Sequence, residues 1–129
     1  MLPLRHTGRW RLAGIAVLVI VLAGTLAPKI PDMHDAGLHS DKWVHALTFM
    51  LLTVWFAGQY SRRSYWRIVV GMLAFGALIE ICQQIVGYRS AEMMDFVADA
   101  IGVLAGMLIA WAGAGGWSLR FEEWIAARD

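Results

Sequence analysis

Carboxylates lie inside two long apolar runs, and this feature limits most strongly how the chain can fold. The segment 76–106 reads GALIEICQQIVGYRSAEMMDFVADAIGVLAG, with Glu80 in the first run and Asp95 and Asp99 in the second. Apolar residues surround these acids on nearly all helical faces, a pattern typical of a membrane span or a fully buried helix. Ionisable groups inside a membrane span are costly, so they indicate a functional site.

The composition favours a membrane protein over a soluble one. Of 129 residues, 59% are hydrophobic and 16% are charged, and seven Trp suit anchors at the membrane surface. The length predicts a single domain. The net charge of +1 gives no reason to expect a nucleic-acid partner, and the single Cys82 excludes an internal disulfide.

Four apolar stretches predict an all-α fold, an integral membrane bundle of four transmembrane helices. The predicted spans cover residues 10–27, 41–60, 66–86 and 92–111. We favour an uncleaved first span over a cleaved signal peptide, because Pro28 would directly follow the cut. Pro28 and Pro31 end the first helix, so the polar segment 28–40 is expected to be a loop. The aromatic spacing of 117–129 predicts an amphipathic helix on the bilayer surface.

The distribution of Lys and Arg predicts the orientation of the bundle. Eight of the 11 lie in the N-terminal segment, the 59–67 turn and the C-terminal tail: Arg5, Arg9, Arg11, Arg62, Arg63, Arg67, Arg120 and Arg128. The other three are Lys29, Lys42 and Arg89. Because positive residues favour the cytoplasmic side, we expect both termini in the cytoplasm and the loops 28–40 and 87–91 outside.

Polar residues of three predicted helices lie at one depth, near the outer ends of the helices. Glu80 and Asp99 each lie about seven residues from the outer end of their helix, roughly 10 Å at 1.5 Å per residue. Helical spacing places them in three stripes, each on one helix face: Asp41, His45 and Thr48; Gly76, Glu80 and Gln84; Asp95, Asp99, Gly102 and Gly106. The spacing Gly102-x-x-x-Gly106 also predicts a close approach by a neighbouring helix.

Five residues of this layer are candidate catalytic groups: Asp41, His45, Glu80, Asp95 and Asp99. We expect His45, oriented by Asp41, to act as general acid or base. The other three acids should repel one another, so that at least one of them stays protonated and can donate.

Three more residues are candidates for ligand binding: Lys42, Gln84 and Arg89. The planar fork of Arg89 fits a carboxylate or phosphate, whereas the simpler role of Lys42 is to extend toward the membrane surface. The hard ligands of the layer suit a divalent cation, but no HExxH-type spacing supports one. We therefore assign no metal ligands and leave the cofactor open. The alternative to a site is a structural network whose buried charges pair and fix the register of the helices.

The short connection between the third and fourth helices predicts an antiparallel hairpin. This hairpin places Glu80 at the depth of Asp99. We expect their oxygens about 5–6 Å apart, with the two acids sharing a proton or bridged by water, His45 or an ion. Arg89 should lie at the mouth of the site, within reach of Asp95 or of an anionic ligand.

These motifs resemble the VanZ-like family of small bacterial membrane proteins. The chain has the residues of the family pattern in order and spacing: Asp41, Lys42, His45, Glu80, Gln84, Arg89, Asp95, Asp99, Gly102 and Gly106. Asp99 stands where the pattern has Asn. The resemblance implies one VanZ-like transmembrane domain over residues 1–129, in the bacterial cytoplasmic (inner) membrane with its site facing the outside or periplasm. The family is named for a protein linked to low-level resistance to the glycopeptide teicoplanin, so a role in the cell envelope and antibiotic resistance is implied, but no reaction.

Two functions remain open at this point. The first is an enzyme that acts at the outer leaflet on a lipid or lipid-linked head group of the cell envelope. The second is a binding or accessory protein for an envelope lipid, an antibiotic or a membrane complex. Membrane lipids with an anionic or lipid-linked head group are the expected partners, and the oligomeric state is open. Ion transport is disfavoured, because the acids occupy only one half of the predicted bilayer.

Overall fold

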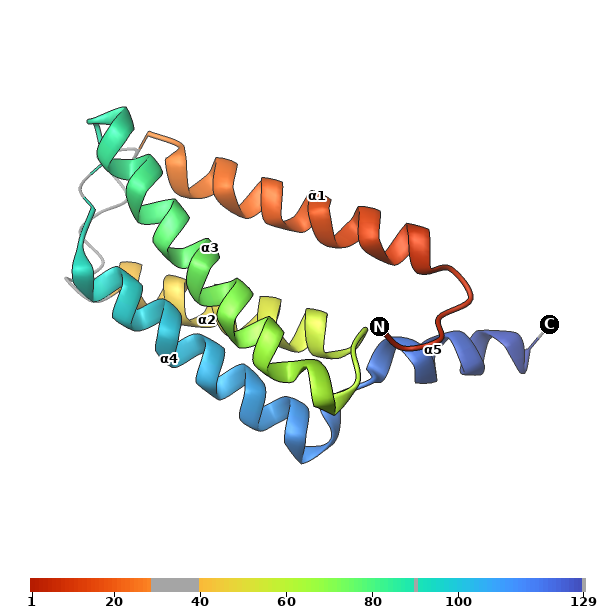
Figure 1. Cartoon of the computed structure of the whole chain (residues 1–129). Helices are drawn as coiled ribbons and strands as arrows, with labels where there is room; N and C mark the ends of the chain where they lie inside the picture. The colour runs from red at the N-terminus through yellow and green to blue at the C-terminus, as the bar shows by residue number, and fades with distance from the viewer. Residues whose placement is uncertain (29–39, 90, 129) are drawn as a thin grey trace.

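The computed structural model describes residues 1–28, 40–89 and 91–128, and within these ranges its regular structure is entirely helical (Figure 1). The α-helices are α1 (Thr7–Leu26), α2 (Ser40–Ala57), α3 (Tyr65–Val86), α4 (Met93–Ile109) and α5 (Trp117–Ala126). A 3-10 turn, Arg62–Ser64, precedes α3, and a π-helical turn, Ala110–Ala114, follows α4. The predicted all-α class is therefore confirmed. Most of the predicted loop 28–40, with Lys29, lies outside the described residues, as does Ser90 in the predicted loop 87–91.

The outer surface of the bundle is apolar, as expected for a membrane protein. Three helical stretches are long and apolar enough to cross a membrane: Thr7–Leu26, Arg62–Val86 and Met93–Ala126. The four long helices expose large apolar side chains, among them Leu12, Ile15 and Val19 on α1, Leu47 and Leu51 on α2, Ile81 and Ile85 on α3, and Leu104 and Leu108 on α4. Such a surface is unfavourable in water and favourable in lipid.

Helices α2 and α4 pack against each other most closely, through the two glycines of the GxxxG motif. A Cβ atom at Gly106 would lie 2.7 Å from the carbonyl oxygen of Met50, and one at Gly102 would collide with the carbonyl group of Ala46. Only glycine lets the two backbones approach this far. The close approach predicted from the sequence is confirmed, and its partner is α2.

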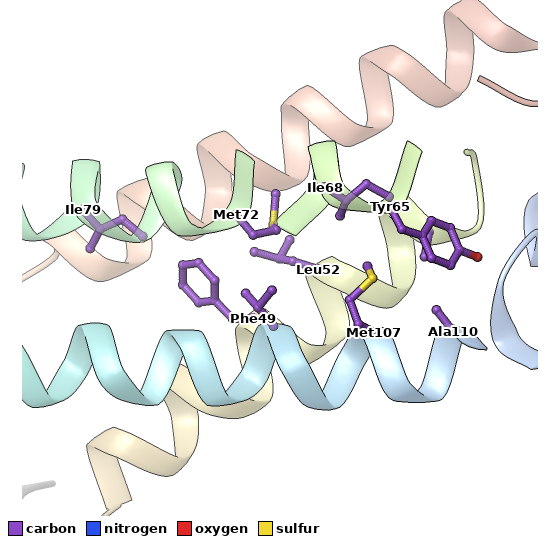
Figure 2. Close-up of a cluster of buried hydrophobic side chains, with 10 residues drawn as sticks. Phe49, Leu52, Tyr65, Ile68, Met72, Ile79, Met107 and Ala110 are labelled. Atoms are coloured by element: carbon purple, nitrogen blue, oxygen red, sulfur yellow. The ribbon is translucent and has the colours of Figure 1, made fainter. Parts of the chain in front are cut away.

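The hydrophobic core fills the bundle between α2, α3 and α4 (Figure 2). Phe49 and Leu52 come from α2, Met72 and Ile79 from α3, and Met107 from α4. Helix α1 packs against this core with one side: Val17, Leu18, Val21 and Leu22. The core leaves the polar residues near the start of α2 and α4 at one end of the bundle.

At the opposite end the chain turns out of the bundle into α5. Gly113 and Gly116 have φ angles of 136° and 72°, which side chains other than glycine rarely adopt, and they separate α5 from α4. The N-terminal segment lies beside α5 (Figure 1), and the Leu2 backbone N–H donates to the Gln59 carbonyl at 2.8 Å. The tail therefore forms the helix that its spacing predicts, and the contact of this helix with a bilayer stays a prediction.

Candidate functional site

Helices α2 and α4 bring His45 between two aspartates. His45 Nδ1 lies 2.9 Å from Asp99 Oδ1, and His45 Nε2 lies 3.9 Å from Asp95 Oδ2. The exposed fractions of His45, Asp95 and Asp99 are 6%, 4% and 0%. When Asp99 is ionised, its carboxylate only accepts hydrogen bonds, so Nδ1 donates to Asp99 and the lone pair of the neutral ring lies on Nε2. Asp99 thereby fixes both the tautomer and the orientation of the imidazole.

The hydrogen-bond partner of His45 Nδ1 is Asp99, whereas the expected orientation of His45 by Asp41 stays a prediction. Asp99 reaches His45 because α4 approaches α2 closely: Gly102 lies against the Ala46 carbonyl, and Asp99, one turn before Gly102, then faces His45. Asp41 still lies close by. One oxygen of Asp41, one nitrogen of His45 and one oxygen of Asp95 lie within 4.8 Å of one another.

Lys42 pairs with two acids at the start of α4. Its Nζ lies 3.0 Å from Glu92 Oε2 and 3.2 Å from Asp95 Oδ1. Lys42 thus supplies a positive partner for Asp95, and the reach of Arg89 to Asp95 or to an anionic ligand stays a prediction. Glu92 escaped the sequence analysis, although its place directly before α4 puts it at the depth of Lys42.

A cavity of about 260 Å³ opens beside His45, between α1 and α2. Its polar side is formed by Asp41, His45 and Arg89, and its apolar side includes Val21 and Phe49. All three residues of the predicted α2 stripe line this cavity, since Thr48 belongs to it as well. The contribution of α1 was missed, because this helix has few polar residues to mark a site.

Two cavities border the predicted polar layer. Glu80 and Gln84 line the second, of about 280 Å³, together with Met93 and Phe96. Asp99 lies close to α3 as well: its Oδ2 is 3.0 Å from the place that a Cβ of Gly76 would take.

The pairing predicted for Glu80 and Asp99, through a shared proton or a bridge of water, His45 or an ion, stays a prediction, as does the distance between their oxygens. Glu80 Oε1 and Asp99 Oδ2 are both buried without a hydrogen-bond partner among the described residues. The other oxygen of Asp99 contacts His45, which comes from α2.

This arrangement combines three chemical abilities. A buried imidazole oriented by a carboxylate can transfer protons to a group bound beside it. A half-buried guanidinium, that of Arg89, lines the same cavity and can bind an anion. A nitrogen and two carboxylate oxygens at this spacing can also ligate a divalent cation.

Comparison with known proteins gives a single finding. A family model described as VanZ/LLP1 matches residues 10–114, which include α2 to α4 and α1 from Trp10 onward. No curated protein and no solved structure matches the chain significantly.

Proposed function

The chain belongs to the VanZ/LLP1 family, and from this premise we propose that it is a multi-pass membrane protein that binds the anionic head group of an envelope lipid and transfers a proton to or from it. The match covers most of the chain, and the apolar helices agree with a membrane location. The reaction site is the cavity beside His45.

Four spans with both termini in the cytoplasm are part of this proposal. Helix α2 carries charges in its first turn, yet it exposes Leu47 and Leu51 like its neighbours, which supports a place in the bilayer. With Cys82 replaced by Ala, cysteine at position 88 should react with an impermeant maleimide from outside, and cysteine at position 63 only after permeabilisation. Labelling of position 63 from outside would invert the orientation and move the site to the cytoplasmic side.

The cavity beside His45 has a polar and an apolar side, and this combination supports binding of a lipid head group. Arg89 offers a positive fork at its polar side, while Val21 and Phe49 offer an apolar wall that can receive the start of an acyl or prenyl chain. A ligand with one anionic end and one apolar end satisfies both sides, and membrane lipids have this form.

His45 supplies the chemistry of the proposal. It lines the cavity, and Asp99 holds Nδ1 at 2.9 Å, so that Nε2 is left to exchange a proton with a bound head group. Asp99 also stabilises the imidazolium that forms when His45 accepts a proton.

Lipid binding is tested with the purified full chain in nanodiscs. Native mass spectrometry should find an anionic phospholipid or a polyprenyl phosphate retained in preference to phosphatidylcholine. Arg89→Ala should lose this preference, and Arg63→Ala, an exposed arginine at the other end of the bundle, is the matched control. Equal retention of anionic and zwitterionic lipids by the wild type would contradict the proposal.

A binding or accessory role without chemistry is the second candidate, and internal pairing of the charges favours it. Lys42 with Glu92 and Asp95, and His45 with Asp99, form pairs that also suit a purely structural network. The two candidates differ in the effect of His45→Ala. If the protein converts a lipid in a panel of envelope lipids, this change abolishes the conversion; if the protein only binds, lipid retention survives the change and no lipid is converted by the wild type.

A further inference from the structure

We propose that Asp41, His45 and Asp95 bind a first-row divalent metal ion such as Zn²⁺ or Mn²⁺. This metal site goes beyond the proposed lipid function and does not depend on it; an ion held by His45 Nε2 would take the place of the proton that this nitrogen exchanges in that proposal.

The first argument is the placement of the three donors. Asp41 and His45 are four residues apart on α2, so they lie on one face one turn apart, and Asp95 arrives from the start of α4. One donor atom from each lies within 4.8 Å of the others. Direct ligation at roughly 2.0–2.2 Å requires donors about 3–3.5 Å apart, so modest side-chain movements close the set around an ion.

His45 Nε2 is the nitrogen that faces the carboxylates. His45 is 6% exposed, and its Nδ1 is occupied by Asp99 at 2.9 Å. Its Nε2 faces Asp95 Oδ2 at 3.9 Å, which is too long for a hydrogen bond. This ring nitrogen, in a side chain that is 6% exposed, faces a carboxylate beyond hydrogen-bond distance and is therefore available as a ligand. A carboxylate that holds the opposite nitrogen is the usual support of a metal-bound histidine.

The two carboxylate oxygens of Asp95 face different groups. Its Oδ1 pairs with Lys42 Nζ at 3.2 Å, while its Oδ2 is the oxygen turned toward His45. The ammonium and a metal ion can therefore share this carboxylate without displacing each other. Lys42 would also hold Asp95 in position, as groups behind a metal ligand commonly do.

The donor set selects the class of metal. One imidazole with two carboxylates suits Zn²⁺ or Mn²⁺ better than Ca²⁺ or Mg²⁺, which prefer oxygen ligands alone. Three protein ligands leave at least one coordination position open. His45 and Asp41 both line the 260 Å³ cavity, so an incoming ligand can reach that position from the cavity.

Equilibrium dialysis of the full chain, in nanodiscs of zwitterionic lipid and without an affinity tag that contains histidine, tests the site directly. The wild type should bind one equivalent of Zn²⁺ with retention after washing, and Mn²⁺ should show an altered paramagnetic resonance spectrum on binding. Asp41→Asn and His45→Ala should each lose stoichiometric binding, whereas Glu123→Gln, an exposed acid of α5, should keep it. Asp99→Asn should weaken binding by about 10–100-fold, because it acts through His45.

Two results would overturn the proposal: wild-type protein without stoichiometric binding, or a folded Asp41→Asn or His45→Ala variant that binds like the wild type. The wild-type measurement does not depend on the stability of any variant. If His45→Ala fails to fold, Asp41→Asn decides, because Asp41 lies at the edge of the bundle and is only half-buried. The measurement uses no anionic lipid, so a negative result would leave the head-group proposal standing.

Discussion

Two buried carboxylates, one at each end of the bundle, differ in how many hydrogen bonds they accept. At one end Glu122 of α5 accepts hydrogen bonds from the backbone N–H groups of Arg5 at 2.6 Å and His6 at 3.1 Å, and from the Trp10 indole N–H at 2.9 Å. At the other end Asp99 accepts from His45 alone, and its Oδ2 has no hydrogen-bond partner among the described residues. Glu122 is 7% exposed and Asp99 is 0% exposed, so burial does not explain the difference.

Glu122 lies among aromatic rings, whereas the histidine that contacts Asp99 lines a cavity. Trp10 contacts Trp55 and Trp117 with ring centroids 5.7 and 5.4 Å apart, so aromatic rings cover the space around Glu122. Asp99, in contrast, contacts a histidine that lines the 260 Å³ cavity. A fully satisfied acid serves stability, whereas an acid with spare bonding capacity is available for function. The following predictions test whether this distinction holds.

Glu122→Gln should produce the largest loss of stability. Both oxygens of Glu122 accept from N–H groups, and the amide NH₂ of Gln would face at least one donor with another donor. Losing a charged acceptor and leaving an N–H group unpaired should lower the free energy of unfolding by about 2–3 kcal/mol. Thermal unfolding in detergent measures the loss, with the neighbouring exposed Glu123→Gln as control. An equal effect of both changes would remove the distinction between the two ends.

Acid should weaken the same end of the protein. Burial alone opposes ionisation of Glu122, but the hydrogen bonds from Trp10, Arg5 and His6 outweigh it and lower the pKa of Glu122 below 4.5. A carboxyl group with a lowered pKa stabilises the fold above its unfolded pKa, and this stabilisation is lost as the pH falls through the folded value. The difference in melting temperature between the wild type and Glu122→Gln should therefore be largest at neutral pH. It should shrink below about pH 4.5. A difference that stays constant into strong acid would show that ionisation of Glu122 does not matter.

The sequence alone does not predict the different hydrogen bonding of Asp99 and Glu122, and the reason differs between the two ends. Periodicity predicted which faces of α2 and α4 are polar, and the GxxxG spacing predicted a close contact. Neither the periodicity nor the GxxxG spacing predicts which helix contacts the glycines or how that helix is rotated. The identity and rotation of this helix, α2, bring His45 Nδ1 to Asp99. The sequence analysis did not single out Glu122, because its partners lie 112 to 117 residues away along the chain.

Trp10→Phe should have a smaller effect at the Glu122 end. Phenylalanine keeps much of the ring packing against Trp55 and Trp117 but removes the indole N–H that donates to Glu122. The loss of one hydrogen bond to a charged group should cost about 1–2 kcal/mol. In the Glu122→Gln background the same change should cost less, because the two residues share that bond. Additive losses in a double-mutant cycle of thermal unfolding would show that they act independently.

Asp99→Asn should cost the least, although Asp99 is the more deeply buried of the two acids. The amide oxygen of Asn can still accept from His45 Nδ1, and its NH₂ would take the position of Oδ2, where no described group donates a hydrogen bond. The change weakens one hydrogen bond but also removes a buried charge, and these two terms oppose each other. The free energy of unfolding should therefore change by less than about 1 kcal/mol, against the larger loss in Glu122→Gln. A loss in Asp99→Asn as large as that in Glu122→Gln would show that the His45 end is also held together by its acid, and the division into a structural end and a functional end would then be wrong.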